Sequence, residues 1–129
     1  MNYTIPEGLT GREELIVTKE QSAPHFGSGL VPVFATPAMI ALMEKTCLYS
    51  VQPHLPEGCG TVGTLVNVTH ERATALGRKV WCESKLLEVD RRRLVFAVTA
   101  FDESGLIGQG RHERFIIESE KFLAKVTGR

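Results

Sequence analysis

The feature that most constrains the fold is residues 37–51, where apolar side chains cover most of the circumference of a helix. Thr36 and Pro37 stand at its start, and two prolines follow soon after its end. Threonine can cap free backbone N–H groups and proline suits the first helical position, so a helix should begin here and stop near Gln52. A helix that is apolar on nearly every side is normally buried. The rest of the chain must therefore wrap around this segment.

After this segment the hydrophobic period changes to two, which indicates β-strands. The candidate strands are residues 61–70, 79–89, 93–102 and 106–117, with a further one at 12–20 before the helix and a loop at 22–32. The connections between the last four are short, so we expect them to pair in sequence order as an antiparallel meander. In the first of them, one face should carry Val62, Thr64, Val66, Val68 and His70. The tail could add a short helical turn.

One antiparallel sheet wrapped around one central helix satisfies this order of elements and buries the helix. This α+β arrangement is the hotdog fold, and we expect a single such domain over residues 1–129. An open sheet with strands this long leaves edges unpaired, so we expect at least a dimer.

The composition excludes several classes of protein. Basic and acidic residues balance at 15 each, so nothing favours binding to nucleic acid. No stretch approaches the roughly 20 apolar residues that cross a bilayer, and the start does not resemble a signal peptide. The three cysteines lack zinc or redox spacing, and no His, Asp or Glu cluster has metal-ligand spacing. We expect a cytoplasmic protein with no metal and no membrane partner.

Glu44 is the first candidate for chemistry, because it falls among the apolar residues of the predicted helix. A carboxylate there costs several kcal/mol unless it is paired, hydrogen-bonded or protonated. Three interpretations of Glu44 are open: a structural glutamate with one buried partner, an outward-facing residue, or a functional acid. Cys47, one turn later, could be a thiolate, but burial without a nearby cation makes a thiol inert.

His70 and Thr36 each have a structural and a functional interpretation. His70 ends a predicted strand and is either structural, or a proton shuttle that a carboxylate orients. Thr36 is either a helix cap, or a hydroxyl that acts at the positive end of the helix dipole.

Three glycines interrupt predicted strands, where glycine weakens the sheet. Gly63, Gly108 and Gly110 each mark either a bulge or a close approach to the backbone. His112 and Arg114 lie on one side of the last predicted strand, without an evident role.

Three segments together resemble a known family. VFATPAMIALMEKTC, GTVGTLVNVTHERATALG and RRLVFAVTAFDESGLIGQGRHERFII are similar to the fluoroacetyl-CoA thioesterase-like branch of the hotdog superfamily, from about Val33 to about Lys125. The resemblance implies a catalytic triad of Thr36, Glu44 and His70. It also implies three residues that contact or lie near the substrate: Phe34, Gly63 and Arg114. The family is homodimeric, with its site at the subunit interface, and uses no metal.

The resemblance therefore implies an acyl-CoA thioesterase acting on a small acyl group, with no cofactor beyond the coenzyme A of the substrate. The segment before the helix is short and holds only Phe26 before Phe34, so selectivity for fluorine is not expected. Two alternatives stay open: a non-catalytic hotdog protein that binds acyl-CoA or another small ligand, and a hotdog hydratase or dehydratase. A dimer of dimers is a further possible assembly.

Overall fold

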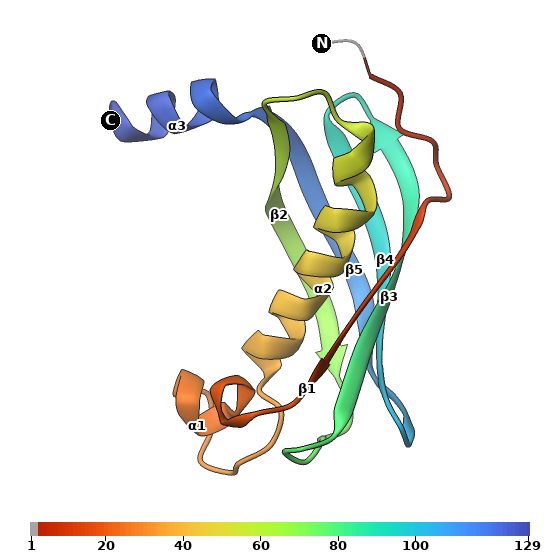
Figure 1. Ribbon diagram of the computed structural model, residues 1–129, viewed down its shortest axis with the longest axis vertical. Helices are drawn as coiled ribbons and strands as arrows, with labels where there is room; N and C mark the ends of the chain where they lie inside the picture. The colour runs from red at the N-terminus through yellow and green to blue at the C-terminus, as the bar shows by residue number, and fades with distance from the viewer. Residues whose placement is uncertain (1–2) are drawn as a thin grey trace.

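The apolar segment after Thr36 forms the long helix α2 (Thr36–Val51), and one antiparallel sheet curves around it (Figure 1). The computed structural model describes residues 3–129. The strands are β1 (Thr10–Ile16), β2 (Cys59–His70), β3 (Lys79–Asp90), β4 (Arg93–Asp102) and β5 (Gly105–Glu118). The shorter elements are η1 (Lys19–Gln21), α1 (Ala23–Phe26), η2 (Gln52–His54) and α3 (Ser119–Thr127). The predicted α+β hotdog architecture is confirmed.

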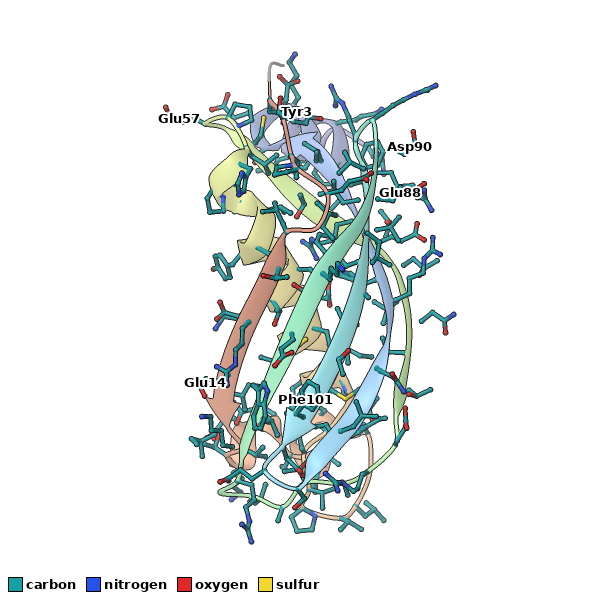
Figure 2. The ribbon with its side chains drawn as sticks, turned by 90° about the vertical axis from the view of Figure 1, so that its right-hand side faces the viewer. Tyr3, Glu14, Glu57, Glu88, Asp90 and Phe101 are labelled. Atoms are coloured by element: carbon teal, nitrogen blue, oxygen red, sulfur yellow. The ribbon has the colours of Figure 1, made fainter. Side chains whose placement is uncertain are left out.

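The strands follow the order β1-β3-β4-β5-β2, as the outer face of the sheet shows in Figure 2. The predicted meander is correct for β3, β4 and β5 but wrong for β2, which pairs with β5 at the far edge. The reason lies in α2, which the chain enters from β1 and leaves into β2. Because these two strands occupy opposite edges, the helix crosses the whole face of the sheet between them.

One side of α2 packs against the sheet, and the other side stays partly uncovered. The buried side carries Ala38, Met39, Leu42, Met43, Thr46, Cys47 and Val51. Burial of a side chain such as Leu42 contributes about 1.5–3 kcal/mol, which makes this face the anchor of the fold. Ala41, Lys45 and Tyr49 are exposed, so the expectation of a helix buried on nearly every side is wrong for the single chain.

A β-bulge interrupts β2 at Thr64. Gly63 lies opposite Arg114 of β5, whereas Leu65 lies opposite the next residue, Glu113. The extra residue reverses the alternation of faces, because side chains in a strand alternate with a period of two. The predicted single face is therefore wrong: Val62 and Thr64 lie on the outer side with Phe115 and Ile117, while Val68 and His70 turn toward α2.

Gly108 shows why α2 can lie so close to the sheet. A Cβ atom at this position would come within 2.7 Å of the Met39 sulfur on α2, so no larger residue fits without movement. Of the two interpretations of this strand glycine, close approach is correct.

The amino-terminal elements are shorter than predicted. The strand predicted over residues 12–20 ends earlier, at Ile16, the last residue of β1. It stops there because Thr18 and Gln21 form a reciprocal cap that starts η1. The predicted loop after it contains the single turn α1, which ends at Gly27 in the left-handed conformation (φ 68°). At the other end, α3 leaves the sheet and extends past β2 (Figure 1). Among residues 3–129, no helix is long and apolar enough to cross a membrane.

Candidate active site

Thr36 and His70 come together at the amino-terminal end of α2, although 34 residues separate them in the chain. The Thr36 Oγ1 atom lies 2.8 Å from His70 Nδ1. Thr36 is the first helical residue and Ala35 is the N-cap, so the predicted role of Thr36 as a helix cap is wrong. Its hydroxyl is committed to the histidine instead of to the helix backbone.

His70 occupies the kind of environment that keeps an imidazole neutral. The ring is half-buried and packs edge-on against Phe34, with the ring centroids 6.2 Å apart. Burial lowers the pKa of His70 below its ordinary value, although the Arg72 backbone opposes this effect. A neutral ring with its proton on Nε2 accepts the Thr36 hydroxyl proton at Nδ1. The Nε2 atom is buried and has no hydrogen-bond partner within residues 3–129.

The pair forms part of the wall of a pocket of about 330 Å³. Phe34 contributes to the same wall, and Leu30 stands at the rim, almost fully exposed (96%). The volume lies at the small end of the usual range for ligand sites, about 300–1,000 Å³, and suits a small group. The amino terminus of α2 also reaches this pocket, where its dipole stabilises negative charge on a bound oxygen.

Glu44, Gly63 and Arg114 form a second group further along α2. The Glu44 Oε2 atom lies 3.5 Å from Arg114 Nη1, in an ion pair whose glutamate is nearly half exposed (43%) and whose arginine is buried. Arg114 Nε donates to Thr61 Oγ1 at 2.7 Å, and its Nη2 donates to the Thr61 carbonyl at 2.9 Å. A Cβ atom on Gly63 would lie 2.9 Å from Glu44 Oε2, so this glycine leaves room for the carboxylate.

One chain does not bring the three residues of the predicted triad together. Glu44 follows Thr36 by eight residues, which places it about 12 Å further along the helix axis. Of the predicted site residues, Phe34, Thr36 and His70 meet at the pocket, and Glu44, Gly63 and Arg114 meet elsewhere.

His112 belongs to the second group, and sequence reasoning gave it no role. It is buried and hydrogen-bonded to Leu65 and Arg114. Its position on the same side of the strand as Arg114 was the available signal. Cys47 is excluded as a nucleophile, because burial strongly raises the pKa of its thiol. In the described part of the chain, no group of three or more His, Cys, Asp or Glu side chains could hold a metal ion.

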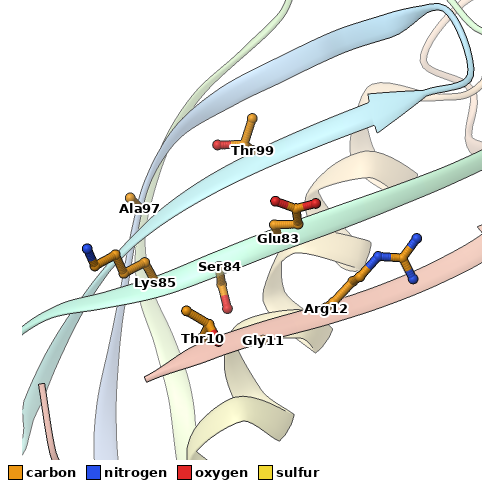
Figure 3. Close-up of a pocket in the computed structure, with 8 residues that line it drawn as sticks. All are labelled: Thr10, Gly11, Arg12, Glu83, Ser84, Lys85, Ala97 and Thr99. Atoms are coloured by element: carbon orange, nitrogen blue, oxygen red, sulfur yellow. The ribbon is translucent and has the colours of Figure 1, made fainter. Parts of the chain in front are cut away.

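A larger hollow of about 770 Å³ lies across β1, β3 and β4 (Figure 3). Its charged side chains are Arg12, Glu83 and Lys85, and the remaining lining residues are small or short polar ones. It lacks the pairing of a nucleophile with a base that covalent or general-base chemistry requires. The pocket at Thr36 and His70 is therefore the candidate active site.

Comparisons with known proteins show the family to which this chain belongs. Residues 17–120 match the model of the fluoroacetyl-CoA-specific thioesterase family. A fluoroacetyl-CoA thioesterase from Streptantibioticus cattleyicolor is 46% identical over 94 residues, which is 73% of this chain and 68% of that protein.

Solved structures give the same result. A structure of the fluoroacetyl-CoA thioesterase superposes with a TM-score of 0.93 at 35% identity and covers 98% of each chain. A hypothetical protein of the thioesterase superfamily from Thermus thermophilus superposes with a TM-score of 0.88 at 30% identity, over 96% of this chain and 92% of that one. The resemblance seen in the sequence is confirmed: the chain belongs to the fluoroacetyl-CoA-specific thioesterase family.

Proposed function

We propose that this protein is an acyl-CoA thioesterase that hydrolyses small acyl groups, with no cofactor beyond the coenzyme A of its substrate. The observation that carries the proposal is the 2.8 Å contact of Thr36 with His70 at the wall of a small pocket, in a chain of this family. Phe34 is the one phenylalanine in the pocket lining, and Phe26 is not part of it. We therefore infer that the pocket does not select for fluorine. Cys47 and Cys82 are buried free thiols that form no disulfide, which favours a cytoplasmic location.

The chemistry follows from the polarity of the pocket. His70 takes the proton of the attacking hydroxyl, from Thr36 itself or from a water that Thr36 positions, and later gives it to the departing thiolate of coenzyme A. The thioester carbonyl becomes an oxyanion, which the free N–H groups at the start of α2 stabilise. If Thr36 is the nucleophile, an acyl ester forms and a water molecule, with His70 as its base, then releases the acid.

We also propose that the working unit is a homodimer joined along β2. This strand is the edge of the sheet beside β5, and its Leu65 and Val66 are about two-fifths exposed. A free edge of this length is suited to pairing with another strand. Two copies of β2 paired antiparallel about a two-fold axis would extend one sheet through both chains.

Such a pairing would complete the triad. In an antiparallel pair of identical strands, the early residues of one copy face the late residues of the other. Gly63 and the neighbouring Glu44 of one copy would then approach His70 at the end of β2 in the second copy. The unpartnered Nε2–H of His70 would donate to that carboxylate, which fixes the tautomer needed for Nδ1 to act as a base.

The first test is release of free thiol from a panel of acyl-CoAs, from short to long and including fluoroacetyl-CoA. Wild-type release that His70→Ala and Glu44→Gln both lose is the expected result. Tight binding of acyl-CoA without release would instead favour a non-catalytic binding protein, and hydration of an enoyl-CoA would favour a hydratase.

The second test is complementation between two inactive variants. Thr36→Ala and Glu44→Gln are each expected to be nearly inactive as pure dimers. After subunit exchange, a mixed dimer has one site with both residues intact, so equal mixing should restore about a quarter of the wild-type activity. No recovery after confirmed exchange would contradict a site shared between two chains.

A further inference from the structure

His112 lies at the centre of the second group, on the side of β5 that faces α2. Its side chain is 1% exposed and stacks on Phe96 with the centroids 6.3 Å apart. The Nδ1 atom lies 2.8 Å from the carbonyl oxygen of Leu65, the residue that follows the extra residue of the bulge. The Nε2 atom lies 3.2 Å from Arg114 Nη1. The ring thus joins the bulge of β2 to the buried arginine.

These two contacts determine the state of the ring. A carbonyl oxygen only accepts a hydrogen bond and a guanidinium only donates, so Nδ1 carries the proton and Nε2 does not. The ring must be neutral, because a proton on Nε2 would point at a cation. Burial and Arg114 both lower the pKa of His112, against the Leu65 carbonyl and the charges of Glu44 and Glu113.

Arg114 has little freedom left once His112 is in place. Two of its nitrogens donate to Thr61, and the third, Nη1, lies between His112 and Glu44. A planar guanidinium held at all three nitrogens presents a fixed direction to its carboxylate. A Cβ atom on Gly63 would also lie 3.2 Å from His112 Cε1, so the ring, the glycine and the carboxylate share one closely packed space.

We propose that His112 is a positioning residue of the thioesterase site. Its neutral ring couples the β2 bulge to Arg114, and Arg114 fixes the direction of the Glu44 carboxylate. His112 does not line the pocket that Thr36 and His70 share. It therefore acts through Arg114 and Glu44 and not on the substrate. The inference rests on the proposed function, in which Glu44 orients the catalytic histidine.

The test compares two replacements of the ring. His112→Gln keeps a neutral donor and acceptor and should retain kcat within about threefold, whereas His112→Met keeps similar bulk without them and should lower kcat by up to about 10²-fold. KM should change little, because Glu44 acts on His70 and not on bound substrate. Ile116→Val, a buried change on the same strand, is the control for a general loss of packing and should leave kcat unchanged.

The decisive comparison repeats His112→Met in a Glu44→Gln background. If His112 acts through Glu44, the second change lowers kcat little further, because the group it positions is already lost. An equal fold-loss in both backgrounds, or wild-type kcat in His112→Met, would overturn the proposal.

A spectroscopic measurement keeps the proposal testable if His112→Met does not fold. Nitrogen NMR of the wild-type imidazoles should show His112 neutral with its proton on Nδ1 from about pH 8 down to well below the ordinary histidine pKa of about 6.5. Protonation of His112 near 6.5, or a proton on Nε2, would overturn it. Absence of thiol release by the wild type would refute the proposed function while leaving this measurement interpretable.

Discussion

The two groups of polar residues along α2 differ in how fully their atoms are paired. Near the start of the helix, Thr36 is exposed and His70 is left with a buried nitrogen that has no partner in the described chain. About two turns further along α2, beside Glu44, Arg114 and His112 of β5 are buried, and their side-chain nitrogens contact neighbouring residues. The first group keeps spare hydrogen-bonding capacity, as reacting groups need, whereas in the second group only the half-exposed Glu44 carboxylate keeps any.

This contrast separates activity from stability. A change in the first group should reduce catalysis and cost little folding free energy, because few native contacts are lost. A change in the second group should expose buried donors or acceptors and reduce both.

The largest effect is expected for His70→Ala. Loss of the acid-base group should lower kcat by about 10²–10⁴-fold. Thermal unfolding should change little, because the ring is only half-buried and its side-chain partner, Thr36, is exposed. Turnover close to wild type would show that the first group, Thr36 and His70, does not carry out the reaction.

Arg114→Met should have the largest effect on stability. It leaves Thr61 Oγ1, the Thr61 carbonyl and His112 Nε2 without a donor, and each buried unpaired atom costs about 1–3 kcal/mol. Urea unfolding should show a loss of several kcal/mol. Arg93→Met, which removes a half-exposed arginine from Glu88 and Glu113, is the control and should cost much less. Equal losses in the two variants would remove the distinction between the two groups.

Gly63→Ala should separate function from stability within the second group, which contains Glu44, His112 and Arg114. The added methyl would meet the flexible end of Glu44, which can move, and would lie 3.2 Å from Cε1 of the buried His112, which must give slightly, so the free energy of unfolding should fall by only about 1 kcal/mol. The displaced carboxylate should lower kcat by about tenfold. Gly108→Ala is the contrast, because its methyl meets the Thr69 backbone and Met39, and stability should fall clearly. Unchanged kcat in Gly63→Ala would show that Glu44 does not need its present position.

The smallest effect concerns pH. The pKa of His70 and that of His112 are both below the ordinary value of 6.5, so the unfolded chain takes up protons at a pH where the folded chain does not. The stabilisation is complete above pH 6.5 and is lost as the pH falls below it. Urea unfolding between pH 7.5 and 5 should show this decline, and His70→Ala combined with His112→Gln should flatten it. A wild-type stability that does not change over this range would contradict both pKa directions.

The sequence predicted the elements better than their arrangement. Residues 37–51 and the period-two runs predicted the helix and most strand positions, because hydrophobic period is a local property. The pairing of β2 with β5 depends on where α2 crosses the sheet, and the bulge at Thr64 depends on packing between strands, so neither is visible in a local pattern. Similarly, the residue pattern singled out Thr36, Glu44 and His70 as candidates and the resemblance implied that they form a triad, but neither indicated their separation into two groups.

The bulge at Thr64 has a consequence for how the length of this chain can change over evolution. Deleting one residue between Gly63 and Val66 would restore an unbroken ladder, with Gly63 still opposite Arg114 and Val66 still opposite His112. Gly63 and His70 would stay on the side that faces α2, because an even spacing in a regular strand keeps two side chains on one face. Losing or gaining one residue between Val66 and His70 would instead turn His70 away from α2. Relatives should therefore tolerate loss of the bulge residue and length changes in the exposed segment around Leu30, while the number of residues between Val66 and His70 stays constant.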